Sequence, residues 1–184
     1  RLPRPLRRSV ESTFALLPAL GPRRGLYRRS KRFFAAVGQE APRRYARWIS
    51  IFTNAGKDAL YTPAFRAAMA GIDSVDLVVG GYRAVEGADV VDATLAVDVA
   101  TYLPDDLLVK VDIASMAHSL EARSPMVDHR FMEFAATIPS TLKLHGLATK
   151  YVLRRAVRGL LPAAVLRRPK MGFGVPIDRW FQGE

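Results

Sequence analysis

The sequence predicts a mainly α-helical fold, and three observations lead to this prediction. Apolar residues recur at spacings of three and four along most of the chain, which is the period of a helix with one buried face. Proline and glycine residues divide this pattern into segments of ordinary helix length. Hydrophobic residues make up 49% of the 184 residues, so the chain has enough apolar surface to form a core.

The predicted helices follow one another between these breaks. The helix predicted over residues 42–52 carries Tyr45, Trp48, Ile49 and Phe52 on one side. A later one starts at Pro104 and has acidic residues in its first turn, where the helix dipole favours them. The expected helices cover residues 5–18, 26–37, 42–52, 56–71 (a pair broken at Pro63), 88–101, 104–120, 128–138, 149–158 and the stretch that begins at Pro176.

Residues 72–86 have no clear helical period. The run VDLVVGGYRAV is compatible with a short strand that leads into a glycine turn, and we interpret it as a variable connector. Gly80 and Gly81 are only a weak indication of a phosphate loop, because no Lys-Ser/Thr pair follows them.

The net charge of +11 is unevenly distributed. The first 50 residues hold 13 Lys and Arg against Glu11 and Glu40, and the rest of the chain is neutral overall. An anionic partner such as nucleic acid would explain this surplus. We favour arginine-faced helices, solvated or packed on another part of the protein, because the arginines alternate with apolar residues at helical spacing.

Several classes of protein are excluded by composition. The chain has no cysteine, so disulfides, thiolate metal sites and a cysteine nucleophile are absent from it. No apolar run approaches the ~20 residues that span a membrane, and the start RLPRPLRRSV lacks a secretory signal. We therefore expect a cytoplasmic protein without a membrane partner. The missing first Met, and an end at DRWFQGE inside an expected helix, lead us to expect cuts within a longer protein.

Residues 101–180 carry three sequence blocks in order: TYLPDDLLVKVDIASMAHSLEARSPMVDHR, TKYVLRRAV and LPAAVLRRPKMGFGVPIDRW. Their order and spacing resemble the C-terminal half of the asparagine synthetase family, and the resemblance is weaker over residues 1–100. The family usually has Pro-Phe-Leu-Asp where this chain has Pro125-Met126-Val127-Asp128. This swap keeps an apolar pair, so it should change packing rather than chemistry.

The resemblance implies that residues 1–184 are the helical C-terminal part of an α/β synthetase domain of the PP-loop ATPase type. The family's N-terminal glutaminase domain and its Ser-Gly-Gly-x-Asp-Ser ATP loop do not occur in this sequence. The intact enzyme would convert aspartate to asparagine through a β-aspartyl-adenylate, with ATP, glutamine-derived ammonia, and Mg²⁺ held outside this chain. It would pack on its own missing N-terminal segments, and association as a homodimer stays open. We expect the chain alone to be inactive.

Lys150 is the residue that we expect to be catalytic. In the pattern Lys-x-x-Leu-Arg it resembles the family's catalytic lysine, whose ammonium would stabilise the charge that develops on pyrophosphate. The alternative is an exposed lysine at a helix start.

Lys170, Gly172 and Gly174 lie in the loop PKMGFG. This loop resembles a lid near the phosphates, and we predict ATP or pyrophosphate binding there, with a plain connector as an equal alternative.

Glu121 and Arg123 belong to the element Glu-Ala-Arg-Ser-Pro-x-x-Asp. The pair could orient a substrate or line an ammonia path, and the alternative is an internal salt bridge with Asp128 as a helix cap. No metal ligand is expected in this chain, because Asp105 and Asp106 at a helix start are more often caps.

Two other functions stay open. A related synthetase could form a different amide, or a β-lactam, from the same kind of adenylate. Less favoured is a basic helical domain that binds nucleic acid or a protein partner through residues 1–50. The exact amide acceptor is not readable here, because much of its pocket would lie upstream.

Overall fold

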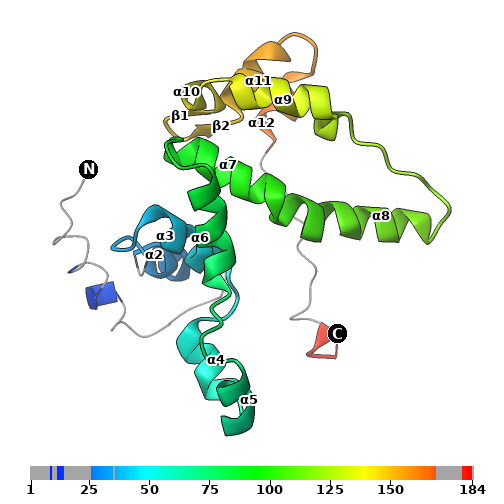
Figure 1. The fold of residues 1–184 in the computed structure, drawn as a ribbon. Coiled ribbons are helices and arrows are strands. Elements are labelled where there is room, and N and C mark those ends of the chain that lie inside the picture. The colour runs from blue at the N-terminus through cyan, green and yellow to red at the C-terminus, as the bar shows by residue number, and fades with distance from the viewer. Residues whose placement is uncertain (1–8, 10–11, 15–25, 35, 169–179, 184) are drawn as a thin grey trace. The chain divides into compact units, whose positions relative to one another are not determined.

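The computed structural model describes residues 9, 12–14, 26–34, 36–168 and 180–183. Over these residues the chain is mostly helical, as predicted, and its short strands form one hairpin (Figure 1). The chain divides into two compact units, Arg1–Asp128 and His129–Glu184, which are described separately. The predicted helices over residues 5–18 and after Pro176 lie largely outside the described residues. Within the described stretches, no helix has the length and apolarity needed to cross a lipid bilayer.

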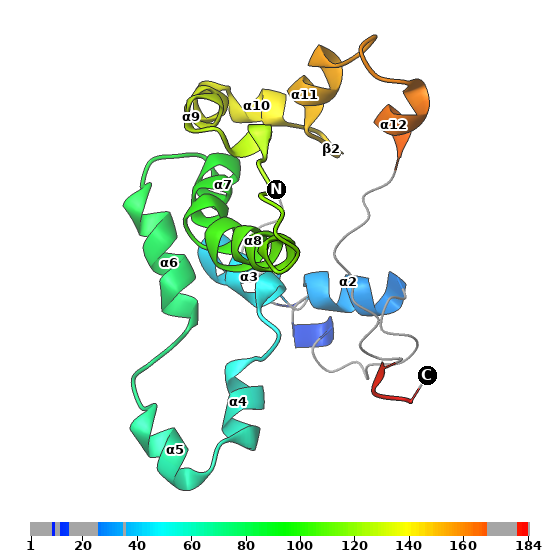
Figure 2. The same ribbon diagram turned by 90° about the vertical axis from the view of Figure 1, so that its right-hand side faces the viewer.

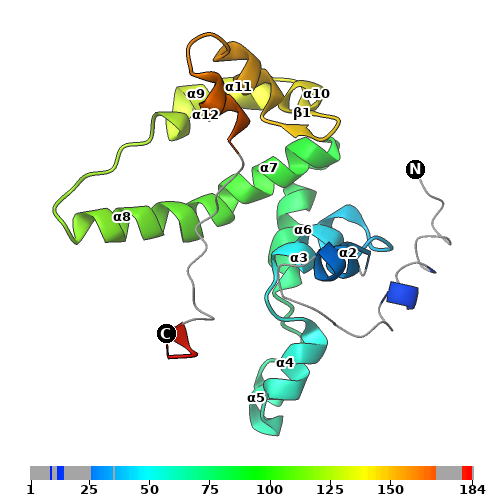
Figure 3. The ribbon, with the colours of Figure 1, turned by 180° about the vertical axis from the view of Figure 1, so that it is seen from behind.

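The first unit consists of helices joined by short turns. Its elements are α2 (Leu26–Phe34), α3 (Ala41–Ile49), α4 (Asn54–Leu60), α5 (Pro63–Ala68), α6 (Val75–Ala84), α7 (Val90–Ala100), the π-helix η1 (Leu103–Leu108), α8 (Val109–Met116) and the 3₁₀ turn η2 (Pro125–Val127). The α4–α5 pair projects away from the group formed by α3, α6 and α7 (Figures 2 and 3).

Helices α3, α6 and α7 pack together and form the core of this unit. Ala46, Val78 and Val97, one from each helix, form a buried cluster, and Tyr45 and Tyr82 pack against it. Because these buried side chains are small, the helix backbones can approach one another closely.

Two tyrosines tie α3 and α6 to α7 by hydrogen bonds. The Tyr45 hydroxyl donates to the Oδ1 atom of Asp98. The Thr94 hydroxyl donates to the carbonyl of Val90 at 2.6 Å, so the Tyr82 hydroxyl must be the donor to Thr94 Oγ1 at 2.5 Å. Burial, followed by the hydrogen bond and the negative charge of Asp98, raises the pKa of Tyr45 above its ordinary value. Tyr45 therefore stays a hydrogen-bond donor.

The prediction for residues 72–86 is wrong, because Val75–Ala84 forms helix α6. Gly80 and Gly81 lie inside this helix, where glycine normally lowers stability. At Gly81 the reason is a close approach: an added Cβ would lie 2.9 Å from Cγ2 of the buried Val97. Helix α6 packs against both α3 and α7, and no local sequence pattern reveals this packing.

The break between α4 and α5 occurs where it was predicted. The hydroxyls of Thr53 and Thr62 cap the two helices by accepting backbone N–H groups at 3.0 and 3.2 Å, and Pro63 opens α5. Helix α3 has Pro42 in its first turn, as expected, but ends at Ile49. The prediction that Phe52 continues its apolar face is therefore wrong.

The long helical segment after α7 ends earlier than predicted. Thr101 interrupts the helix, which resumes as η1 and continues as α8 to Met116 rather than Leu120. Ser119 takes a left-handed conformation with φ 57°. Its N–H donates to Met116 O at 2.9 Å, and the Leu120 N–H donates to Ser115 O at 3.0 Å. This is the Schellman pattern of a helix end, with serine in the place usually taken by glycine.

Helix α8 carries an apolar stripe that the described residues leave exposed. Val109, Ile113 and Met116 follow the i, i+4, i+7 spacing of a buried face, yet their side chains are 44%, 65% and 54% exposed. An exposed apolar stripe of this kind marks a surface that packs against something else.

The second unit contains α9 (His129–Thr137), α10 (Ser140–Lys143), β1 (Leu144–His145), β2 (Ala148–Thr149), α11 (Tyr151–Ala156) and α12 (Ala163–Arg167). Helix α9 begins directly after Asp128 and ends before Pro139, as predicted. The helix predicted over 149–158 covers only Tyr151–Ala156, which corrects both of its ends.

The antiparallel hairpin of β1 and β2 explains the late start of α11. Leu144 pairs with Thr149, and His145 pairs with Ala148. Gly146, with φ 58°, supplies the left-handed residue that a two-residue hairpin loop requires. The glycine-containing turn was the local signal for this hairpin, and the sequence analysis missed it.

Replacing Gly80 and Gly81 separately tests the α6–α7 contact. Alanine favours helix by about 1 kcal/mol over glycine, and a Cβ at Gly80 meets nothing within 4 Å. We therefore expect Gly80→Ala to raise the free energy of unfolding by about 0.5–1 kcal/mol. Gly81→Ala should lower it by about 1–3 kcal/mol, because Val97 is stiff and buried. Denaturant unfolding of both variants checks this, and equal effects would contradict the close contact.

Candidate functional site

Glu121 and Arg123 lie in the irregular segment between α8 and η2. The Schellman end of α8 turns the chain immediately before them. Arg123 Nε donates to Glu121 Oε1 at 2.8 Å, and its Nη2 donates to Oε2 at 3.2 Å. The Arg123 side chain is 83% exposed and the Glu121 side chain is 66% exposed. Solvent therefore screens this ion pair, and it contributes little to stability. The structure thus contains the Glu121–Arg123 ion pair. A role of this pair in substrate or ammonia handling stays a prediction.

Lys150 joins β2 to α11. Its backbone adopts φ 55° and ψ 36°, the left-handed region, and its carbonyl accepts the first hydrogen bond of α11 from Arg154 N at 2.9 Å. The side chain is exposed. Its ammonium has no hydrogen-bond or ion-pair partner among the described residues. The lysine is therefore at a helix start, as expected, and is free to bind an anion.

A left-handed lysine is unusual. In this conformation Cβ crowds the following carbonyl oxygen, at a cost of about 1–2 kcal/mol. Such residues persist where the surrounding structure determines them, and they cluster at functional sites. The backbone of Lys150 thus supports the functional alternative over a plain surface lysine.

The aromatic residues next to Lys150 contact one another. The rings of His145 and Tyr151 stack with centroids 4.7 Å apart and planes inclined by 24°. Arg155 Nη1 donates to the Tyr151 hydroxyl at 3.0 Å, and its guanidinium carbon lies 5.7 Å from the ring centroid. No sequence motif indicated this arrangement of His145, Tyr151 and Arg155.

The second unit contains a long stretch with positive charge only. From Phe134 to Ile177 there are eight Lys and Arg and no Asp or Glu. Counting all residues after position 50 together concealed this stretch, because acidic residues elsewhere balance it. A stretch of one sign favours an anionic ligand such as a phosphate group.

Three predicted site residues, Lys170, Gly172 and Gly174, lie outside the described residues. Glu121 and Arg123 belong to the first unit and Lys150 to the second. Among the described residues, no group of three or more His, Asp or Glu could hold a metal ion. Asp106 instead forms an exposed ion pair with Lys110 at 3.1 Å.

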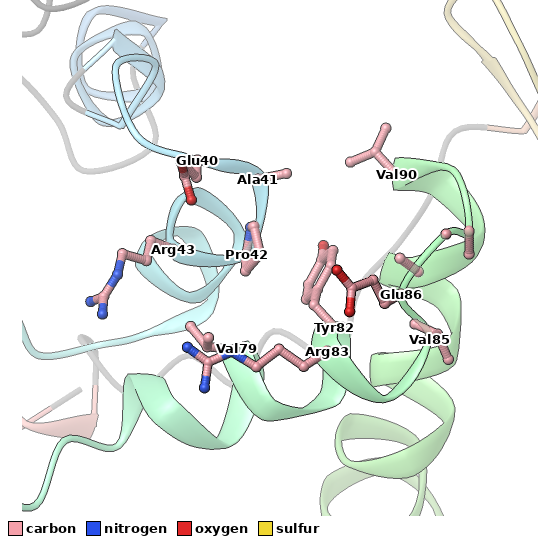
Figure 4. Close-up of a pocket in the computed structure, with 13 residues that line it drawn as sticks. Glu40, Ala41, Pro42, Arg43, Val79, Tyr82, Arg83, Val85, Glu86 and Val90 are labelled. Carbon is pink, nitrogen blue, oxygen red and sulfur yellow. The ribbon is translucent and has the colours of Figure 1, made fainter.

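The first unit also has a cavity of about 420 Å³ that contains none of the predicted site residues. It lies between the start of α3, the end of α6 and the start of α7 (Figure 4). Its walls combine Tyr82 with charged side chains of both signs: Glu40, Arg43, Arg83 and Glu86. The sequence offered no motif for this cavity.

Comparison with known proteins identifies the family. The sequence profile of the family described as asparagine synthase matches residues 3–184. A provisionally named glutamine-hydrolyzing asparagine synthetase of Mycobacterium tuberculosis is 41% identical over 107 residues, which are 58% of this chain and 16% of that protein. Glutamine-hydrolyzing asparagine synthetase 1 of Bacillus subtilis is 44% identical over 88 residues, 48% of this chain and 14% of that protein.

The chain thus spans only about a sixth of the length of these relatives. The search of solved structures found no match. The match of the family profile nevertheless extends over nearly the whole chain, from the basic first residues to the end. The resemblance carried by the three sequence blocks is confirmed, and the chain belongs to the asparagine synthase family.

Proposed function

We propose that the chain is the helical C-terminal part of the synthetase domain of a glutamine-hydrolysing asparagine synthetase. The carrying observation is the family match over residues 3–184. The match includes the basic residues 1–50, which supports a synthetase segment over a separate nucleic-acid-binding module. The apolar stripe of α8, exposed among the described residues, offers a surface for packing against other residues of the protein.

In the proposed reaction, an oxygen of the aspartate side-chain carboxylate attacks the α-phosphorus of ATP. The bond between the α-phosphorus and the oxygen that bridges it to the β-phosphorus breaks, and pyrophosphate leaves with the electron pair. Ammonia released from glutamine then attacks the acyl carbon and loses one proton to solvent or a base. The bond between the acyl carbon and the AMP oxygen breaks, AMP leaves with the electron pair, and asparagine forms. The family resemblance implies that Mg²⁺ would be held by ligands outside this chain and would neutralise phosphate charge.

Lys150 is the proposed catalytic residue of this chain. Its exposed ammonium is unpaired among the described residues, and the surrounding stretch carries positive charge only. A fixed cation beside the leaving pyrophosphate stabilises the transition state more than the bound substrates. Lys170, Gly172 and Gly174 are proposed to contact the phosphates, and Glu121 and Arg123 to handle aspartate or ammonia.

Lys150→Ala in the full-length enzyme tests the catalytic role. We expect aspartate-dependent pyrophosphate release to fall about 10²–10³-fold in kcat, or ~3–4 kcal/mol, because one transition-state contact is lost. Glutamine hydrolysis should continue and serves as the folding control. Lys150→Arg should rescue poorly, because a planar guanidinium does not replace a compact ammonium. Pyrophosphate release within a few-fold of wild type would refute the assignment.

Lys150→Gly separates the backbone of this position from its side chain. Glycine adopts a left-handed conformation without the Cβ clash. We expect Lys150→Gly to be about 0.5–1 kcal/mol more stable than Lys150→Ala in denaturant unfolding, with an equal loss of pyrophosphate release. Ser119→Gly against Ser119→Ala, at the left-handed end of α8, is the matched stability control. A less stable glycine variant would argue against the left-handed conformation.

Glu121→Gln tests the proposed role in substrate or ammonia handling. The change should alter the free energy of unfolding by less than about 0.5 kcal/mol, because the Glu121–Arg123 pair is exposed. Asparagine formation should fall about 10-fold or more if the carboxylate orients a reactant. Asp106→Asn, which breaks the exposed Lys110 pair of the same unit, is the control and should change neither quantity. Identical behaviour of the two variants would reduce Glu121 to a surface residue.

A further inference from the structure

A series of side-chain contacts runs from the hairpin to α11 around Lys150. His145 is the last residue of β1 and stacks on Tyr151, the first residue of α11. Arg155, four residues further along α11, holds the Tyr151 hydroxyl and lies over its ring. Tyr151 is therefore held by a contact from the hairpin and by another from its own helix.

These contacts tie together the backbone on both sides of Lys150. Ladder pairing fixes His145 opposite Ala148, two residues before Lys150. The stack then fixes the residue that follows Lys150 to the same hairpin. Figure 2 shows how directly β2 leads into α11. Lys150 is the single residue between the hairpin and α11. Its backbone dihedral angles therefore determine how α11 is oriented relative to the hairpin.

The left-handed conformation of Lys150 needs such a constraint. A lysine outside a folded environment avoids φ 55°, and the first hydrogen bond of α11 forms equally well after an extended residue. Hairpin pairing acts only on the residues before Lys150. Among the described residues, the His145–Tyr151 stack links the two sides by a ring contact, in addition to the packing of α10 on α11.

We propose that His145 and Tyr151 are positioning residues for Lys150. Their stack holds the hairpin on the first turn of α11 and thereby sets the direction in which the Lys150 side chain leaves the backbone. This inference rests on the proposed catalytic role of Lys150. It requires an aromatic ring at each position, and it requires neither the imidazole proton nor the phenol proton.

A contact that only stabilises the fold would behave differently from a positioning contact. Loss of a stabilising contact lowers the amount of folded enzyme and affects both half-reactions together. Loss of a positioning contact lowers kcat for pyrophosphate release and leaves KM and glutamine hydrolysis in place, because a small displacement of a catalytic group slows only the step that it serves.

The experiment uses the full-length enzyme with the variants His145→Ala, His145→Phe, Lys150→Ala and the double variant His145→Ala/Lys150→Ala. His145→Ala should lower kcat for pyrophosphate release by about 10–100-fold, while KM for aspartate and glutamine hydrolysis stay within about twofold. His145→Phe keeps a ring for stacking and should restore kcat to within about threefold of wild type. In the Lys150→Ala background, His145→Ala should cause no further loss, because no ammonium remains to be positioned.

Each result decides a separate question. Normal kcat in His145→Ala, beside a large loss in Lys150→Ala, overturns the positioning role and leaves the proposed function standing. Normal pyrophosphate release in Lys150→Ala overturns the catalytic role of Lys150, on which this inference rests. Equal losses in His145→Phe and His145→Ala, or an additional loss in the double variant, mean that the imidazole acts independently and overturn the stacking role.

The second ring provides the same comparison if His145→Ala fails to fold. Tyr151→Phe keeps the stack and loses only the bond from Arg155, so kcat should stay within about threefold of wild type. Tyr151→Leu keeps a comparable apolar bulk and loses the ring, and its kcat should fall as expected for His145→Ala. Equal activity of these two variants overturns the proposal.

Discussion

The close approach of α6 and α7 at Gly81 and Val97 is the constraint on which the first unit depends. The absence of a Cβ at Gly81 lets the buried Val97 side chain lie against the α6 backbone. This separation brings Tyr82 within reach of Thr94 and leaves Tyr45 of α3 facing Asp98. Both hydroxyls are then satisfied at the edge of the cluster, where an unpaired polar group would cost about 1–3 kcal/mol. The core is small, so this geometry matters more than the buried area.

The sequence predicted the helices well where their ends are controlled locally. Pro63 acts on neighbouring backbone groups, so it was sufficient to locate the break between α4 and α5. The start of α4 at Asn54, after the Thr53 cap, and the end of α5 at Ala68 differ from the predicted bounds 56–71. The errors occurred where distant residues decide the structure. Helix α6 packs against α3 and α7, which are distant in the sequence or not visible as its neighbours from local patterns. Serine takes the left-handed place at the end of α8 that the sequence rules assign to glycine. The hairpin was missed because its strands are only two residues long.

The candidate site was predictable in a similar, partial way. Lys150 stands out through its motif, and the three sequence blocks were sufficient to identify the family. The conformation of Lys150 and its aromatic neighbours could not be predicted. His145 and Tyr151 are brought together by a hairpin that the sequence did not reveal, and Lys150 was assigned to the helix itself. The basic stretch from Phe134 to Ile177 was visible in the sequence. It was overlooked because the charge was summed over a longer segment.

Positive charge alone does not explain why a lysine occupies position 150. Arg154, Arg155 and Arg158 already supply cations in the same stretch, and glycine or asparagine would adopt the left-handed turn at lower cost. The left-handed backbone therefore favours glycine or asparagine over lysine at position 150. The positive charge of the neighbouring arginines gives no reason for a further cation there. What lysine adds is a compact ammonium on a flexible stem, leaving the chain at the junction that the hairpin and α11 hold in place. The Lys150 ammonium carries several N–H donors, and the backbone sets the direction of its side chain before the reaction begins. Such an ammonium suits the negative charge that develops on a leaving phosphate. The strained backbone and the identity of the side chain have a common explanation only if the ammonium has something specific to bind.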